Sequence, residues 1–320
     1  MKRSRKWLAA MGFLFILLLA GCSKEAEGPE DKAEDHKVIG VSMANFSDQY
    51  VTYMLDAMKE EEKKHSSVEF IYTDAQDDSS TQMSQIENFI SQDVDTIIFS
   101  PVDTVAAEGM LDTINGAGIP SIVLLKTFDG VEKATAYVGS ESIQAGIIQM
   151  EEAAKMLGGK GNVAILMGPL GHEAQVKRTE GNKQVIDKNP KMKVVLEDAA
   201  DYDREKGMTL MENWLQTNKK IDAVIANNDE MAIGAIMAIE AAGKLDDILV
   251  AGIDATPPAL EYVQEGKMEL TVFQDAIGQG KSAIQTAVKT ANGEKVEKNV
   301  LIPFELVTKE NAAKYAEKWK

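Results

Sequence analysis

Polar side chains that suit hydroxyl groups recur in the loops that follow strand-length apolar runs of this sequence. Asp254 ends one such run, and Asn228 and Gln274 follow two others. Carboxylates and amides pair with hydroxyl groups, while aromatic rings pack on C–H faces. The set therefore predicts binding of a neutral polyhydroxylated small molecule rather than catalysis.

These loops share a place at the expected carboxyl ends of strands, where open parallel sheets bind their ligands. They comprise 45–50, 74–78, Lys126, 171–178, 201–203, 227–230, 254–256 and 274–275. An extracellular carbohydrate hydrolase is the less favoured alternative, because it needs two carboxylates at a set separation. Asp48, Asp254 and Asp275 are the candidates, but nothing in the sequence fixes their spacing.

The composition excludes several other classes of function. The 320 residues include 51 Asp and Glu against 34 Lys and Arg, a net charge of −17. So acidic a surface repels phosphate backbones, which argues against nucleic-acid binding. The single cysteine is Cys22, and the histidines are His36, His65 and His172. With so few cysteines and histidines, we expect neither a His-rich metal site nor a Cys/His nucleophile pair.

Two segments resemble cofactor- or metal-binding motifs, but each lacks a residue that its motif requires. Gly280-Lys281-Ser282 resembles the end of a phosphate-binding loop, but Asp275 stands where the first glycine is required. No glycine-rich dinucleotide fingerprint follows the first expected strand. A calcium-loop spacing begins at Asp74, yet Ser79 replaces the necessary glycine. We therefore expect no cofactor and no metal.

The elements that must position these loops alternate regularly from Val38 onward. The expected strands are 38–43, 68–73, 96–100, 121–125, 162–167, 193–197, 223–226, 248–252 and 270–273. The expected helices include 50–64, 81–92, 142–157, 204–217 and 231–242. Strands alternating with helices predict an α/β fold of parallel sheets covered on both faces. The number of strands and the length favour two such sheets over one.

The N-terminus reads as an export signal, with basic residues before an apolar run at 7–20 that is short for a membrane span. The run ends in Leu-Ala-Gly-Cys at 19–22, which resembles the bacterial lipoprotein cleavage box. The resemblance implies a signal peptide at 1–21 and a diacylglyceryl group on Cys22, so that the body is extracytoplasmic and held to the membrane by lipid. An uncleaved membrane anchor is the alternative. Residues 22–37 predict a flexible tether, or a short solvated helix.

The strand-end loops resemble those of the periplasmic sugar-binding proteins of the ribose and galactose type, the substrate-binding components of ABC importers. The motifs are ANNDEMAIGA at 226–235, GIDATP at 252–257, TVFQD at 271–275 and DYDREKG at 201–207. IGVSM at 39–43, FQDA at 273–276 and IPFELVT at 302–308 look most like the inositol- and rhizopine-binding branch. The likeness covers essentially all of residues 38–310, in order.

This resemblance implies a type I periplasmic-binding-protein fold, with two Rossmann-like lobes joined by three crossings. The N-terminal lobe would comprise 38–140 and 275–303, and the C-terminal lobe 141–274 and 304–320. It also implies a set of ligand-binding residues in the cleft between the lobes. They are Phe46, Asp48, Tyr50, Lys126, His172, Arg178, Tyr202, Asn228, Asp254 and Gln274.

Several of these residues have structural alternatives. Asn228 is also a good cap for the helix that follows it, and Asp254 would serve as a turn residue. Arg178 is alternatively a surface or lobe-stabilising arginine, and His172 an incidental loop residue. If Asp254 lies at the floor of a cleft, its carboxylate is solvated until a ligand arrives, so we expect its loss to affect binding more than stability.

One departure from the family pattern bears on the ligand. The family usually has Asp-Arg or Asn-Arg after the fourth strand, where this chain has Leu125-Lys126. Lysine cannot make the planar two-pronged contact of arginine. Val176 also stands where the ribose-type loop has its ligand arginine. These departures therefore favour a deoxy, methylated or cyclitol ligand over a standard pentose or hexose.

From these observations we expect the protein to be a monomeric, lipid-anchored receptor that delivers a sugar or cyclitol to the membrane permease of an ABC importer. A sensor that presents a signal sugar to a membrane kinase or chemoreceptor is the alternative, with the same fold. A sugar-responsive DNA-binding regulator is disfavoured, because an export signal occupies the place of its helix-turn-helix.

The lipid anchor can be tested directly. Cys22→Ser removes the thiol that would carry the diacylglyceryl group, so the variant should lose incorporation of a labelled fatty acid and leave the membrane fraction. The folded body should keep its melting temperature. Label that persists in the Ser variant would show that Cys22 is not the lipidated residue.

Overall fold

The computed structural model describes residues 36–319. The predicted signal peptide at 1–21 and the lipidation site Cys22 lie outside this range, as does the predicted tether at 22–37 up to residue 35. The first strand begins at Lys37, one residue earlier than expected, so the last tether residue belongs to the sheet. Among residues 36–319 there is no helix that is both long enough and apolar enough to span a membrane.

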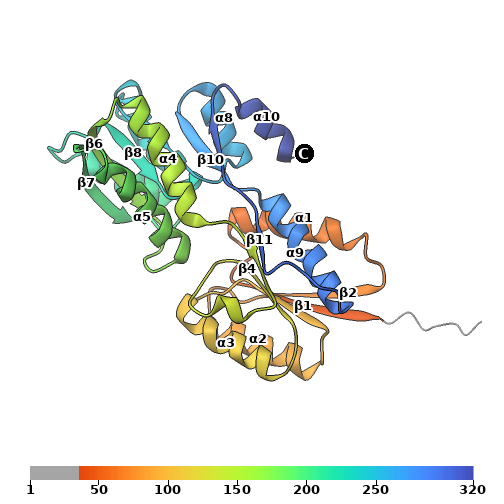
Figure 1. Ribbon diagram of the computed structural model, residues 1–320. Helices are drawn as coiled ribbons and strands as arrows, with labels where there is room; N and C mark the ends of the chain where they lie inside the picture. The colour runs from red at the N-terminus through yellow and green to blue at the C-terminus, as the bar shows by residue number, and fades with distance from the viewer. Residues whose placement is uncertain (1–35, 320) are drawn as a thin grey trace, which may run out of the picture. The chain divides into compact units, whose positions relative to one another are not determined.

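The first sheet has 6 strands in the order β11-β5-β4-β3-β1-β2. These strands are β1 (Lys37–Met43), β2 (Val68–Asp74), β3 (Thr96–Phe99), β4 (Ser121–Leu125), β5 (Ala136–Gly139) and β11 (Asn299–Leu301). All of their pairings are parallel. Two layers of helix cover the sheet, α1 (Gln49–Glu62) with α9 (Ala276–Ala291) and α2 (Ser79–Ser91) with α3 (Thr104–Gly116), as Figure 1 shows.

The second sheet also has 6 strands, in the order β12-β10-β9-β8-β6-β7. They are β6 (Lys160–Met167), β7 (Lys191–Ala199), β8 (Ala223–Ala226), β9 (Leu249–Ala251), β10 (Leu270–Phe273) and β12 (Glu305–Thr308). Only β12 runs antiparallel to its neighbour. The helices are α4 (Ser142–Met156), α5 (Glu173–Asp187), α6 (Arg204–Leu215), α7 (Asp229–Ala241), α8 (Pro257–Glu265) and α10 (Ala312–Ala316). Short 3-10 turns lie at Val131–Lys133, Leu245–Asp247 and, as η3, Glu317–Trp319.

The chain passes from one sheet to the other between β5 and α4, between β10 and α9, and between β11 and β12. Two of these passages are joined, because Ser140 Oγ donates to the Ile302 carbonyl oxygen at 2.6 Å. Gln279 Nε2 donates in turn to Ser140 Oγ at 2.8 Å. The expected fold class, two α/β lobes with mostly parallel sheets, is thereby confirmed.

The central strands are buried along their whole length, as expected for parallel sheets with helices on both faces. Every residue of β3 and of β8 is buried. Their apolar runs were therefore recognisable in the sequence. The short strands β5, β11 and β12 were not predicted; β11 has 3 residues and a largely exposed pattern, which gives no apolar run.

A carboxylate is enclosed in the core of the second lobe. Asp229, the first residue of α7, has no exposed surface. It accepts hydrogen bonds from the Thr271 hydroxyl at 2.7 Å and from the Thr256 backbone N–H at 2.9 Å. Gly252 lies against it, since a Cβ on Gly252 would come within 2.2 Å of Asp229 Oδ1. Burial raises the pKa of Asp229 to about 7, although these hydrogen bonds favour the ionised form.

Stability should therefore depend on pH through Asp229. The unfolded chain has a carboxyl pKa of about 4, so between about pH 4 and 7 the folded state binds more protons and stability falls as pH rises. Asp229→Asn removes this titration. Measured by urea unfolding, the parent should lose roughly 2–4 kcal/mol relative to the variant between pH 4 and 8, since one pKa unit is about 1.4 kcal/mol.

Asp246→Asn removes an exposed charge from the same lobe and serves as the control. It should leave the pH profile of the parent unchanged. A difference between parent and Asp229→Asn that is constant with pH would contradict the assignment.

Candidate functional site

A buried guanidinium group joins three strand ends of the second sheet. Arg178 on α5 is only 5% exposed. Its Nη1 donates to the carbonyl oxygen of Asn227, which follows β8, at 2.7 Å. The same nitrogen lies 3.4 Å from Oδ1 of Asp254, beyond β9. Nη2 donates to Oε1 of Gln274, beyond β10, at 2.6 Å. The structure thus brings together three of the predicted residues, and a surface position for Arg178 is wrong.

The position of Arg178 follows from close helix packing. A Cβ on Gly146 of α4 would lie 2.0 Å from the Arg178 carbonyl oxygen, so only glycine allows α4 to approach α5 this closely. This close approach places α5 over the strand ends. The Arg178 guanidinium also lies over the ring of Phe304, with its central carbon 5.9 Å from the ring centroid.

Two buried donors in this cluster have no protein acceptor. Arg178 Nε and Asn227 Nδ2 are both buried without a hydrogen-bond partner among the described residues. The Asn227 Oδ1 atom, by contrast, accepts from the Gly168 N–H and the Thr179 hydroxyl. A buried donor left unpaired costs roughly 1–3 kcal/mol. Oxygen atoms of a polyhydroxylated molecule are suitable acceptors for both donors. Asn227 was not among the predicted ligand-binding residues, although it lies in the predicted loop 227–230.

Asp254 is 5% exposed, which corrects the expectation of a solvated carboxylate. Its backbone φ of 122° lies in a region that residues other than glycine rarely adopt. Burial is the largest influence on its carboxyl and raises the pKa, while the positive charge of Arg178 opposes that rise. The neutralising partner of Asp254 is therefore Arg178, and removal of either residue leaves the other buried without its counter-charge.

Two aromatic side chains lie near this cluster. The Tyr202 ring packs against Gly168, where a Cβ would come within 2.2 Å of Tyr202 Cζ. His172 meets Tyr202 edge-on, with centroids 5.3 Å apart and planes at 85°. Burial, with the charges of Lys126 and Arg178, lowers the pKa of His172 to about 3, so its imidazole is neutral at physiological pH.

Tyr50 contributes from the first lobe. Its hydroxyl donates to Gln279 Oε1 at 2.8 Å, which fixes the ring at the start of α1. Burial raises the pKa of Tyr50, and Asp254 is the largest charge acting in the same direction.

Lys126 is a buried cation in the first lobe, only 7% exposed. It follows Leu125, whose φ is 73°. Within residues 36–319 no side-chain hydrogen bond or ion pair to Lys126 is formed. Burial lowers its pKa, while the carboxylates of Asp77 and Asp48 oppose that effect. Its ammonium group is therefore a donor available to a bound molecule.

Other predicted residues are engaged within their own lobes. Asn228 caps α7, because its Oδ1 accepts from the Met231 N–H at 3.0 Å. Its Nδ2 donates to the Tyr202 carbonyl oxygen at 3.3 Å. Asp48 caps α1 by accepting from the Val51 N–H at 3.0 Å. The structural alternative for Asn228 is therefore present, and a ligand contact by Asn228 or Asp48 stays a prediction.

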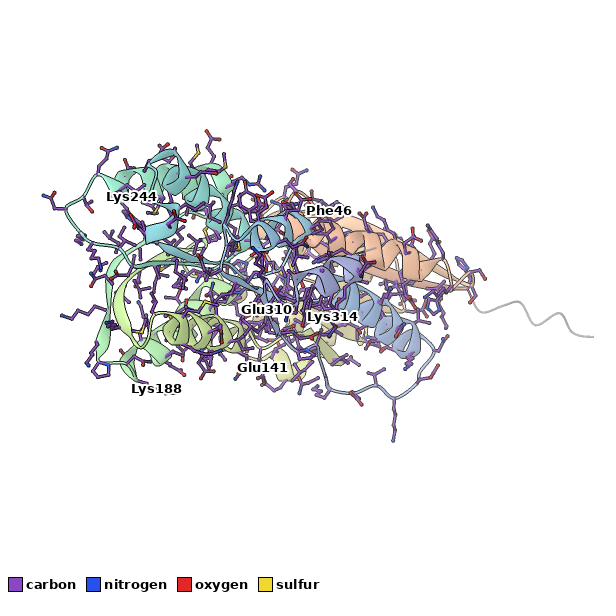
Figure 2. All side chains as sticks on the ribbon, turned by 90° about the horizontal axis from the view of Figure 1, so that it is seen from above. Phe46, Glu141, Lys188, Lys244, Glu310 and Lys314 are labelled. Atoms are coloured by element: carbon purple, nitrogen blue, oxygen red, sulfur yellow. The ribbon has the colours of Figure 1, made fainter. Side chains whose placement is uncertain are left out.

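Phe46 is half-buried and lies beside the beginning of α1 (Figure 2). It packs against the core of the first lobe, and the structure does not join it to the Arg178 cluster.

Glu173 was not predicted. This first residue of α5 accepts from the Ser142 hydroxyl at 2.9 Å and from the Thr127 hydroxyl at 3.4 Å. Thr127 belongs to the first lobe, next to Lys126, so the carboxylate joins the two lobes there. Burial raises the pKa of Glu173. Glu173 lies in the predicted loop 171–178, but it was not among the predicted ligand-binding residues, because a glutamate in the first turn of a helix is common.

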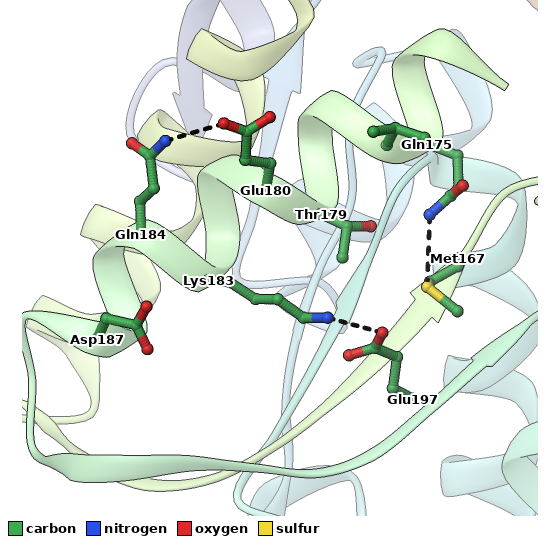
Figure 3. A pocket seen from close by; sticks show the side chains of 9 residues that line it. Met167, Gln175, Thr179, Glu180, Lys183, Gln184, Asp187 and Glu197 are labelled. Atoms are coloured by element: carbon green, nitrogen blue, oxygen red, sulfur yellow. Dashed lines mark hydrogen bonds and ion pairs between the residues drawn. The ribbon is translucent and has the colours of Figure 1, made fainter. Parts of the chain in front are cut away.

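A hollow of about 510 Å³ lies elsewhere, between α5 and the edge strand β7 (Figure 3). Two of its charged residues pair with each other, since Lys183 Nζ donates to Glu197 Oε1 at 2.8 Å. Gln175 Nε2 points to Met167 Sδ at 3.5 Å. None of the ten predicted ligand-binding residues lines this hollow. Residues 36–319 also contain no group of three side chains able to hold a metal ion.

Comparison with known proteins agrees with this geometry. The profile of the periplasmic binding protein domain matches residues 39–295. A protein of Rhizobium meliloti that is named for rhizopine binding is 42% identical over 285 residues, 87% of this chain and 92% of that protein. The ribose import binding protein of Bacillus subtilis is 33% identical over 308 residues, 95% of this chain and 99% of that protein.

Among solved structures, an ABC transporter solute-binding protein from Bacillus halodurans with bound myo-inositol is 59% identical, with a TM-score of 0.87. The match covers 88% of this chain and 98% of that one. The resemblance to sugar-binding proteins, and to their inositol- and rhizopine-binding branch, is confirmed. The relatives are binding proteins, which confirms the expectation that the chain is not an enzyme.

The burial of Asp254 changes what its removal should do. Asp254→Ala leaves Arg178 without its carboxylate and puts a residue that tolerates positive φ less well than aspartate at a strained position, so unfolding should become easier by about 3 kcal/mol. Asp254→Asn keeps the shape and tolerates positive φ better, and should lose less. Thermal unfolding without ligand measures both.

Asp201→Ala removes an exposed aspartate that also has a positive φ, of 53°, and is the matched control. It should unfold close to the parent temperature. If Asp254→Ala does the same, Asp254 is not the partner that stabilises buried Arg178.

Proposed function

Because the chain belongs to the periplasmic binding protein domain family, we propose that it is the solute-binding lipoprotein of an ABC importer, with a cyclitol such as myo-inositol as its ligand. The carrying observation is the set of buried donors around Arg178, two of which have no protein acceptor. A ring of hydroxyl groups offers oxygen atoms in several directions at once, which is what such a set requires.

The choice of a cyclitol over a ribose-like sugar is supported by the bound myo-inositol of the 59% identical solute-binding protein. The ribose import relative is more distant, at 33%. Lys126 supports the same choice, since a single ammonium donor replaces the two-pronged arginine that the pattern of the family leads one to expect.

Binding is proposed to draw the two lobes together around the ligand. The lobes would be 38–140 with 275–303, and 141–274 with 304–320. Tyr50 and Lys126 belong to the first, whereas Arg178, Asp254 and Gln274 belong to the second. A ligand that contacts both groups stabilises the closed arrangement, because only that arrangement makes all of its contacts.

Delivery follows from closure in this proposal. The closed, loaded, monomeric protein is held at the membrane by the lipid on Cys22 and presents its ligand to the permease subunits. The family supports an extracytoplasmic place, and the lipoprotein-like cleavage box supports the anchor.

Calorimetric titration of the full chain in detergent tests the ligand. Myo-inositol should bind at one site per chain and raise the melting temperature, because a ligand that binds only the folded state stabilises it. D-ribose should bind roughly tenfold more weakly or worse. The absence of binding to myo-inositol and to other cyclitols would refute the proposed ligand class.

Lys126→Arg tests the selecting residue in the same assay. It should shift the ratio of the myo-inositol and D-ribose affinities toward ribose, with the ligand-free melting temperature little changed. The exposed Lys188→Arg, on the far end of α5, is the control. Equal affinity ratios in the parent and Lys126→Arg would show that Lys126 does not select.

A further inference from the structure

Trp319 belongs to η3, the last described turn of the chain, and it contacts the segment that carries Asp254 of the Arg178 cluster. Its indole Nε1–H donates to the carbonyl oxygen of Ala255 at 2.8 Å. Ala255 directly follows Asp254, the partner of Arg178. The hydrogen bond therefore reaches the backbone that carries a predicted ligand-binding carboxylate, from a residue more than sixty positions away.

The backbone at Asp254 and Ala255 needs such support. Both residues have positive φ, 122° and 51°, and non-glycine residues in this region are strained. Strained backbone persists only where surrounding contacts hold it. Here Thr271 Oγ1 accepts from the Ala255 N–H at 3.2 Å, and Trp319 holds the carbonyl oxygen of the same residue.

The indole ring also contacts residues of both lobes. Its centroid is 5.8 Å from that of Phe273, the residue before Gln274, with the rings at 84°. It is 4.7 Å from the ring of Tyr53 on α1. Tyr53 lies one helical turn beyond Tyr50, so the contact reaches the first lobe next to a predicted ligand-binding residue.

Neighbouring contacts fix η3 in place. Lys318 Nζ lies 4.5 Å from the Phe273 ring centroid and 4.8 Å from that of Tyr315. The same nitrogen pairs with Glu305 Oε1 at 2.7 Å, and the Tyr315 hydroxyl donates to Glu305 Oε2 at 2.8 Å. Trp319 is therefore held against β10 and β12 by several contacts besides its own.

We propose that Trp319 is a positioning residue of the binding site. Its N–H holds the Asp254–Ala255 turn in the conformation that presents the carboxylate to Arg178, and its ring links this turn to α1 of the first lobe. The inference rests on the proposed function for its effect on ligand affinity, but the hold on the turn is independent of any ligand.

Two substitutions separate the N–H from the ring. Trp319→Phe keeps an aromatic ring and loses the donor, while Tyr53→Ala keeps the donor and removes the aromatic partner on α1. Trp214→Phe is the matched control, because Trp214 is a buried tryptophan in the core of the same lobe and, among residues 36–319, its indole N–H makes no hydrogen bond to the turn. All variants are made in the full chain.

The first readout is amide hydrogen exchange in the ligand-free protein, followed in peptides that span residues 252–260. Trp319→Phe should speed exchange there, because opening of the turn becomes easier. Trp214→Phe should leave exchange in this stretch as in the parent. Unchanged exchange in Trp319→Phe would overturn the proposal, whatever the ligand proves to be.

The second readout is the dissociation constant for myo-inositol. Trp319→Phe should weaken binding roughly three- to tenfold, the range for loss of one hydrogen bond, and Tyr53→Ala should weaken it through loss of the link between lobes. Trp214→Phe should bind like the parent, even where its melting temperature falls. If the parent binds myo-inositol and Trp319→Phe binds it with the same affinity, the positioning role is overturned. A parent that fails to bind refutes the proposed ligand, and the exchange result then decides the role of Trp319 alone.

Discussion

A guanidinium group buried at the ends of three parallel strands needs acceptors on several sides, and much of the second lobe is arranged to supply them. Arg178 takes the Asn227 carbonyl oxygen, the Asp254 carboxylate and the Gln274 amide oxygen, one from each of three consecutive strand ends. Gly146 lets α5 approach closely enough for the side chain to reach them. Among residues 36–319 the Nε edge of the guanidinium has no protein acceptor, and this is the edge that we propose the ligand meets.

Much of this was predictable from sequence, because parallel strands bury both faces and end in polar loops. The strands 121–125, 223–226 and 270–273 were predicted at their observed bounds. The loops that end them supplied Lys126, Asn228 and Gln274. The short strands were not predicted, because a strand such as β11, with 3 residues, has no apolar run by which it could be recognised.

The limits at the site have a physical cause. An Asp or Asn between a strand and a helix serves equally as a helix cap or as a ligand group, and sequence does not separate the two. The structure shows Asp48 and Asn228 as caps. Solvation is equally invisible in sequence: Asp254 was expected to be wet and is buried against Arg178, a residue from a distant helix. The contact of Glu173 with Thr127 likewise joins segments that no local pattern relates.

A crystal structure of the protein with myo-inositol bound would show whether the unpaired donors around Arg178 bind the ligand. We expect ligand oxygens within hydrogen-bond distance of Arg178 Nε and Asn227 Nδ2 from the second lobe, and of Lys126 Nζ from the first. Ligand density in the groove between α5 and β7, or a bound ligand that leaves Arg178 Nε unpaired, would contradict this expectation.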